Sequence, residues 1–287
     1  MIPTPASSTG RRGPTGLLLV ALPVALVATL VIWPIMLAVL STVRYPGPDG
    51  VEWSVASYRF FFSDGYSLRN LGITLWTVAV STAILMALSL PLAIYLRFTR
   101  SRAAGVVQAL ALFPLFVPSF IFAYAFIRVL SPLGMVDILL AQVGLPRIPS
   151  PYLTPWGPVI GFVWDNIPLA VLILGAGLAN VAEAEVEAAR DVGAGRIAIL
   201  SRILMPRLWP SLLVASSFVV LGLFTAWTFP FLLGPAAPEM MGPFMLRTFS
   251  DVQDPVQART QAVVTFLFCA LFGWFYVRSV IRNRRAP

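Results

Sequence analysis

The chain has 287 residues, of which 58% are hydrophobic and 11% charged, and its mean hydropathy is +0.85. A soluble domain usually has about a quarter of its residues charged, so the composition excludes an ordinary soluble protein. The net charge is +8 and every basic residue is an arginine, but the arginines form short clusters between apolar runs, which argues against a nucleic-acid-binding surface. The sequence has no histidine and one cysteine, Cys269, so a zinc or haem site is not expected.

Six apolar runs are each long enough to cross a bilayer as a helix, which takes roughly 20 residues. The runs are continuous, whereas the strands of a membrane barrel would alternate polar and apolar residues, so we expect an all-α integral membrane protein. The predicted spans are 16–40, 71–96, 105–130, 157–180, 208–233 and 260–281. We expect residues 16–281 to form a single transmembrane domain, with short tails at 1–15 and 282–287.

The arginines also predict the orientation. Arg11 and Arg12 precede the first apolar run, which is longer than the roughly 7–15 residues of a signal peptide, so we expect a retained helix. With the N-terminus inside, most arginines, including those near Arg100 and Arg285, lie on the inner side. Cytoplasmic loops carry an excess of arginine, so we expect both termini in the cytoplasm.

Several features within the spans have two interpretations each. The phenylalanine run at 60–62 predicts a short helix lying on the membrane surface. Pro114 and Pro118 in the third span and Pro168 in the fourth predict kinks, which can serve a moving pore or be static packing features.

The fourth span contains an acid, Asp165, next to Asn166. A carboxylate in hydrocarbon costs about 2.5–3.5 kcal/mol on insertion scales, so it should face the bundle interior or a water-filled cavity. Asp165 and Asn166 then either line a pathway, where Asp165 would attract a cationic solute, or bond to neighbouring helices. Trp227 belongs to an aromatic-rich part of the fifth span that either gates a pathway or faces lipid.

The segment 181–207, between the fourth and fifth spans, is long and helical in composition, and we call it the elbow. Gly193 is a natural helix terminator, and Ile197, Leu200 and Leu204 recur at helical spacing before Pro206. These residues predict two short helices bent at Gly193, the second ended by Pro206. Such an elbow suits docking to another protein, although periodicity alone fits an ordinary amphipathic surface helix equally well.

The elbow resembles the EAA loop of type I ATP-binding-cassette (ABC) importer permeases. It carries Glu187-Ala188-Ala189, a glycine six positions after Glu187, and Ile203 before Pro206, with Met205 where the family usually has leucine. The string 187–194, which includes Asp191, is closest to the polyamine, iron, sulfate and thiamine branch. The resemblance implies a six-helix, MetI-like permease whose elbow docks on the ATPase. The expected docking residues are Glu187, Ala188, Ala189, Asp191, Gly193, Ala194, Ile203 and Pro206.

The same resemblance implies the partners. These are a cytoplasmic ABC ATPase dimer, a second permease subunit, identical or related, and an extracytoplasmic solute-binding protein, all at the bacterial plasma membrane. The chain has no G-x-x-x-x-G-K-[S/T] loop, so ATP and magnesium belong on the partner, and we expect no cofactor and no enzyme activity in this chain. A polyamine or another small charged solute is the favoured cargo, with a sugar-type importer, or a secondary carrier, as the alternative. An integral membrane enzyme would need a catalytic cluster that one intramembrane acid does not supply.

Overall fold

The computed structural model describes residues 14–47 and 50–284. Arg11, Arg12 and Arg285 lie outside the described residues, as do most of the predicted N-terminal tail and the end of the C-terminal tail. The chain divides into two compact units, Met1–Arg59 and Phe60–Pro287, which are described separately.

The first unit contains the first predicted span and a hairpin that was not predicted. Helix α1 (Pro14–Val27), the π-helical turn η1 (Ala28–Ile32) and α2 (Trp33–Ser41) follow one another without a break. Strands β1 (Arg44–Gly47) and β2 (Gly50–Trp53) then pair antiparallel, with Arg44 opposite Trp53. Helix α3 (Ala56–Ser63) crosses the boundary between the units and contains the phenylalanine run, which confirms a helix there.

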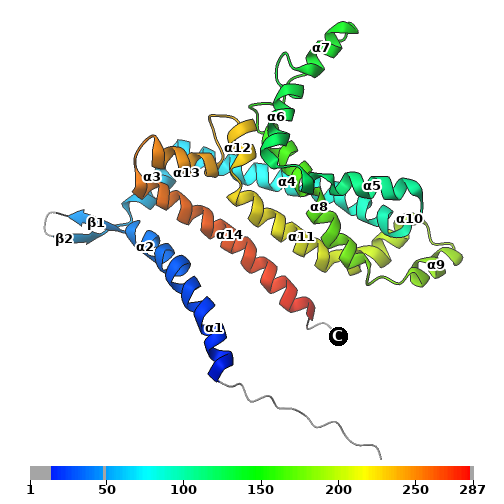
Figure 1. Cartoon of the computed structure of the whole chain (residues 1–287), viewed down its shortest axis with the longest axis horizontal. Helices are drawn as coiled ribbons and strands as arrows, with labels where there is room; N and C mark the ends of the chain where they lie inside the picture. Colours follow the sequence, from blue (N-terminus) through cyan, green and yellow to red (C-terminus); the bar gives the residue numbers. More distant parts are fainter. Residues whose placement is uncertain (1–13, 48–49, 285–287) are drawn as a thin grey trace, which may run out of the picture. The chain divides into compact units, whose positions relative to one another are not determined.

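In the described residues of the second unit, all regular secondary-structure elements are helices. Its elements are α4 (Gly65–Phe98), α5 (Arg102–Leu112), η2 (Phe113–Phe116), α6 (Ser119–Leu130), α7 (Met135–Gln142), α8 (Trp156–Leu178), α9 (Glu183–Asp191), α10 (Arg196–Ile199), η3 (Leu200–Leu204), α11 (Met205–Thr225), α12 (Thr228–Leu233), α13 (Met241–Ser250) and α14 (Pro255–Arg284). Helices α4, α8 and α11 pack against one another and α14 packs against α11 (Figure 1).

Asp64 starts the long helix α4. Its side chain accepts a hydrogen bond of 2.7 Å from the backbone N–H of Ser67, which satisfies one of the donors left open at a helix N-terminus. The hydrogen bonds from Ser67 hold the pKa of the Asp64 carboxyl below its ordinary range.

Within the described residues, six helical segments are long and apolar enough to cross a membrane, as the sequence predicts. They are Ala21–Ser41, Gly65–Phe98, Ser119–Gln142, Trp156–Leu178, Arg196–Thr225 and Pro255–Trp274, with a shorter apolar helix at Arg102–Phe116.

Two of the predicted spans are interrupted, so their continuous ranges are wrong. The predicted third span, 105–130, breaks at Val117, which is extended because the ring of Pro118 disfavours the helical conformation of the residue before it. The predicted fifth span, 208–233, breaks at Ala226, which is extended between α11 and α12. Both breaks lie beside the cleft described below.

Two other prolines are instead accommodated within helices. These are Pro34 and Pro206, and each follows a π-helical turn. In these turns the N–H of Trp33 bonds to the carbonyl of Ala28, and the N–H of Met205 bonds to the carbonyl of Leu200. A proline lacks an N–H and its ring collides with the carbonyl four residues earlier. The wider π turn moves that carbonyl away, and the helix continues.

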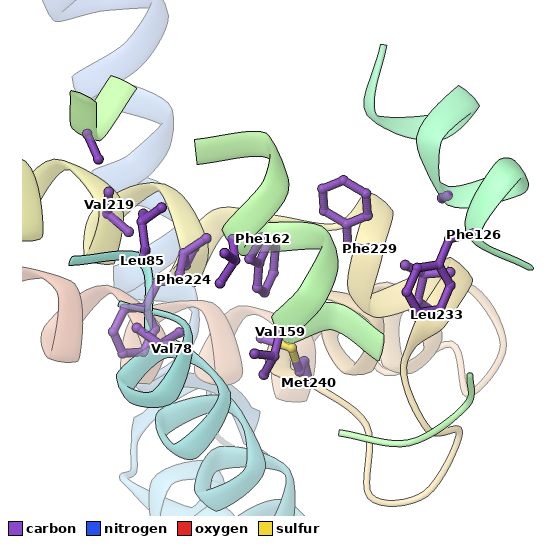
Figure 2. Packing of buried hydrophobic residues seen from close by; sticks show 14 of the residues in the cluster. Val78, Leu85, Phe126, Val159, Phe162, Val219, Phe224, Phe229, Leu233 and Met240 are labelled. Atoms are coloured by element: carbon purple, nitrogen blue, oxygen red, sulfur yellow. The ribbon is translucent and has the colours of Figure 1, made fainter. Parts of the chain in front are cut away.

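The main apolar core lies where α4, α8, α11 and α12 meet (Figure 2). Gly157 and Gly161, four residues apart on α8, allow α12 to approach closely. A Cβ on Gly157 would lie 2.3 Å from the carbonyl oxygen of Leu233, and one on Gly161 would lie 2.6 Å from the ring of Phe229. Small residues at this spacing bring helices into close contact in membrane proteins.

A buried polar cluster fastens the segment before α13 to α4. Asn70 accepts a hydrogen bond of 3.0 Å from the N–H of Glu239, and Thr74 accepts one of 2.8 Å from the N–H of Met241. The Glu239 carboxylate, 7% exposed, accepts from Nε of Arg247 at 2.6 Å. This hydrogen bond raises the pKa of the Arg247 guanidinium above its ordinary value.

Candidate functional site

The elbow begins with α9, which ends where the sequence predicts. Gly193 has a backbone φ of +83°, a conformation that residues with a Cβ rarely adopt. The N–H of Gly193 bonds to the carbonyl of Arg190 at 2.9 Å, and the N–H of Ala194 bonds to that of Ala189 at 2.9 Å. These two bonds form a Schellman motif, the usual way in which a glycine terminates a helix. The predicted bend at Gly193 is therefore confirmed.

The second half of the elbow differs from the prediction. Pro206 does not end a separate helix, because the π turn η3 carries the chain without a break from α10 into α11. The predicted apolar face is only partly confirmed, since Leu204 is buried but Ile197 is 82% exposed and Leu200 36% exposed. The buried residues are Ile199, Leu204 and Leu208, because the extra residue of the π turn rotates the helical face.

Ion pairs join α9 to the two spanning helices beside it. Glu183 accepts hydrogen bonds from Arg97 and, at 3.2 Å, from Arg100, both near the end of α4. Glu185 pairs with Arg207 of α11 at 2.7 Å. The hydrogen bond from Arg97 and the charge of Arg100 lower the pKa of Glu183 below its ordinary value. An apolar cluster lies beneath these pairs, with Val186 packed among Leu174, Leu178 and Leu204.

The elbow thus has a fixed inner face and an exposed outer face. Ala189, Ala194 and Ile203 are half-buried against the apolar cluster, so they position the elbow. The outer face combines the carboxylates of Glu187 and Asp191 with large apolar side chains. Its exposed residues include Glu187, Ala188, Asp191, Val192, Gly193, Ile197 and Pro206, and several arginines of the elbow are exposed as well.

Val192, 84% exposed, and Ile197 were not predicted as part of this surface. Both are large apolar residues that a helical reading would place inside, and the sequence offers no local sign that they point outward. Glu187 also lines a hollow of about 270 Å³ together with Arg97, Phe98, Arg100, Glu183, Val186 and Arg190.

At the other candidate site, the structure brings Asp165, Asn166 and Trp227 together. They line a cleft of about 230 Å³, hereafter the cleft, whose walls also contain Ser119, Phe162, Gly222, Leu223, Ala226, Thr228 and Phe229. The side chain of Asp165 is half-buried and accepts a hydrogen bond of 2.9 Å from the hydroxyl of Ser119. The amide N–H of Asn166 donates to the carbonyl of Phe162 at 2.9 Å, so Asn166 mainly holds α8 to itself.

Both helix breaks border the cleft. Ser119 begins α6 directly after the break at Val117, and Ala226 and Trp227 form the break between α11 and α12. Irregular backbone at membrane depth is tolerated where it is buried in protein or lines a water-filled cavity. Ser119 and Thr228 were not predicted as lining residues. The one available sign in the sequence was the proline before Ser119, which interrupts the helix there.

The aromatic residues of the predicted fifth span do not act as one group. Phe224 and Phe229 are buried in the core, whereas Phe218 and Phe231 are exposed. Figure 2 shows Phe229 and Phe162 extending from α12 and α8 within the core. Trp227 is 41% exposed, lines the cleft and stacks on Phe231 at 4.4 Å between ring centroids.

No protein-family model matches the chain. Among curated proteins it is similar to the spermidine/putrescine transport system permease protein PotB of Escherichia coli (strain K12), with 22% identity over 275 residues, covering 91% of this chain and 98% of PotB. It is also similar to the molybdenum transport system permease protein ModB of Azotobacter vinelandii, with 23% identity, covering 74% of this chain and 95% of ModB. The trehalose transport system permease protein SugA of Mycobacterium tuberculosis (strain H37Rv) is 30% identical over 174 residues, covering 59% of this chain and 55% of SugA.

Solved structures share the fold. A chain of a bacterial alginate ABC transporter, solved in complex with an alginate pentasaccharide-bound periplasmic protein, matches with a TM-score of 0.78 at 18% identity, covering 94% of this chain and 95% of that one. A chain of the MetNI methionine ABC transporter in an inward-facing conformation matches with a TM-score of 0.57 at 17% identity, covering 75% of this chain and 94% of that one. The chain is therefore similar over nearly its whole length to permease proteins of transport systems, it shares the fold of chains from ABC transporters, and it is a multi-pass membrane protein.

Proposed function

We propose that this chain forms the translocation pathway of an ABC importer, and that its elbow docks on a separate cytoplasmic ATPase. The exposed outer face of the elbow is the observation that carries the docking proposal. Two large apolar side chains, Val192 and Ile197, are exposed on the elbow, as are the carboxylates of Glu187 and Asp191. Exposed apolar groups surrounded by polar ones mark sites where proteins bind one another.

The inner face of the elbow gives it the stiffness that coupling requires. The ion pairs of Glu183 and Glu185 connect α9 to α4 and α11, and the π turn makes α10 continuous with α11. A displacement of the outer face by a partner would therefore move two spanning helices. In this proposal both chain termini are cytoplasmic, the ATP and its magnesium are bound by the partner, and the chain itself binds no cofactor.

The remaining partners follow from the same proposal. They are a second permease subunit, identical or related, and an extracytoplasmic binding protein that delivers the solute. The alginate transporter provides support, because its structure was solved with a periplasmic protein.

A small charged solute, such as a polyamine, is the favoured cargo. The spermidine/putrescine permease PotB matches nearly the whole chain, and a carboxylate lies in the cleft. A sugar is the alternative cargo, favoured by the similarity to the trehalose permease SugA and to the alginate transporter. A panel of polyamines, molybdate and sugars, tested by thermal shift on the partner binding protein, separates these cargoes.

Purification of the tagged full chain from its own host membranes tests the docking proposal. An ABC ATPase should co-purify in near-stoichiometric amount, identified by mass spectrometry and by magnesium-dependent ATP hydrolysis. Glu187→Arg should release the ATPase, because an arginine at this exposed position would repel a basic group of the partner that the carboxylate attracts. Asp251→Asn, at the exposed end of α13, is the control and should retain the ATPase. Wild-type chain without an ATPase, or full retention by Glu187→Arg, would contradict the proposal.

A further inference from the structure

The cleft contains one charged group, the carboxylate of Asp165, and no arginine among its described lining residues. Ser119 donates one hydrogen bond to Oδ1 of Asp165, and no ion pair involves Asp165 in the part of the chain that the structure describes. A carboxylate in a spanning helix is costly unless a partner compensates its charge. One neutral hydroxyl compensates it only in part, so the cleft carries an excess of negative charge.

The end of α11 adds to this negative potential. The helix stops at Thr225, and the N–H of Ala226 bonds to the carbonyl of Leu223 at 3.3 Å, three residues back. Gly222, Leu223 and Ala226, which belong to this helix end, line the cleft. The C-terminal end of a helix carries about half a negative charge, and broken helices in transporters use such ends to bind cations.

An aromatic wall faces the same space. The indole of Trp227 is partly exposed and lines the cleft beside Phe162 and Phe229. Tryptophan is the best cation–π partner among the side chains, and aromatic walls are used in proteins to bind organic ammonium groups. A sugar would instead need several free hydrogen-bonding groups, and one of the two N–H groups of the Asn166 amide is already donated to Phe162.

The size of the cleft limits what it can hold. Its volume of about 230 Å³ is below the roughly 300–1,000 Å³ of ordinary ligand pockets. It can therefore hold the charged end of a solute and a short part of its alkyl chain, but not a whole oligosaccharide.

We propose that the cleft is a binding site for the primary ammonium group of an aliphatic amine, with Asp165 as its counter-ion and Trp227 as its cation–π wall. The site would be a station on the pathway of the proposed transport function, on which it rests. The competing role for Asp165 is structural: through Ser119 it would hold the first turn of α6. An asparagine at 165 keeps an oxygen that Ser119 can bond to but removes the charge, so this substitution distinguishes the two roles.

The test measures equilibrium binding of radiolabelled putrescine to the full chain in lipid nanodiscs. Wild-type chain should bind putrescine saturably, with affinity that falls as salt rises and with no competition from trehalose. Asp165→Asn should weaken binding at least tenfold. Trp227→Ala should weaken it several-fold, whereas Trp227→Phe should stay near wild type because it keeps an aromatic face. The matched control is Asp251→Asn, which removes the same charge outside the cleft and should bind as wild type does.

Absence of saturable putrescine binding to the wild type would overturn the proposal, and so would unchanged binding by Asp165→Asn. If Asp165→Asn fails to fold, Trp227→Ala decides, because its partly exposed side chain tolerates truncation, and unchanged binding by that variant would equally overturn it. The assay requires no ATPase. Loss of putrescine binding with an intact ATPase complex would therefore remove the amine site alone, and loss of the ATPase complex would remove the proposed function.

Discussion

The elbow and the cleft are held together by different forces. The elbow has an exposed outer face, and on its inner side the ion pairs of Glu183 and Glu185 add to the apolar cluster around Val186 in attaching it to spanning helices. The cleft contains a single charge, and its walls are placed by close packing of Gly157 and Gly161 against α12. The difference follows from the solvent. Where water reaches the charges, ion pairs form without a large desolvation cost, whereas helices that lie in lipid associate mainly by van der Waals contact.

The comparison predicts that packing changes near the cleft have the largest effect. Gly157→Ala places a methyl group about 2.3 Å from the carbonyl of Leu233, a backbone atom that can move only if α12 moves. We expect a loss of about 1–3 kcal/mol of stability, the usual cost of overpacking, together with loss of putrescine binding. Thermal unfolding in detergent measures the first effect. The control is Gly175→Ala on the same helix, where a Cβ meets nothing within 4 Å. Equal melting temperatures for the two variants would contradict the packing account.

The next effect is expected at the bend of the elbow. At Gly193, φ is +83° and a Cβ would meet nothing within 4 Å, so Gly193→Ala tests backbone strain alone. The expected cost is about 1–2 kcal/mol for the left-handed conformation, seen as reduced ATPase retention. Gly195→Ala has the same open surroundings without a positive φ and should retain the ATPase. Similar retention by both variants would show that the bend does not depend on this conformation.

Removal of an ion pair should have a smaller effect. Exposed ion pairs contribute little to stability, so Glu183→Gln should leave melting nearly unchanged and should reduce transport per ATP hydrolysed by about two- to fivefold. Arg97→Gln should match it, and Arg100→Gln should do less, because the Arg100 side chain is 87% exposed. The charge-reversed pair Glu183→Arg with Arg97→Glu should recover part of the loss. An unchanged transport ratio in Glu183→Gln would show that the pair does not couple α9 to α4.

The smallest effect is a pH dependence confined to the elbow. The arginines lower the folded-state pKa of Glu183, so the pair stabilises the elbow above the ordinary glutamate pKa of about 4.3 and loses this stabilisation as pH falls through the lowered value. A nitroxide at Val192→Cys, in a Cys269→Ala background, should therefore become more mobile in that acid range. With Glu183→Gln added, the mobility should no longer change with pH over this range. A transition that persists in Glu183→Gln would assign it to another group.

The elbow could be predicted because its determinants are contiguous. Gly193 ends α9 through bonds to residues only a few positions earlier, so a local pattern was sufficient. The π turn before Pro206 was not predicted, because proline has several outcomes. Pro118 follows a break, whereas Pro206 lies within a continuous helix. Prolines also lie inside spanning helices at Pro23, Pro91, Pro168 and Pro210.

By itself the sequence determined that the chain has six apolar runs able to span a membrane and a helical elbow bent at Gly193, because hydropathy and a contiguous motif are local properties. Only the tertiary structure decided what surrounds Asp165. Ser119, Asp165 and Trp227 come from three different helical regions, and they meet because glycines on α8 let α12 pack closely while two helices break nearby. Such a meeting depends on distances between helices, which no short stretch of sequence contains.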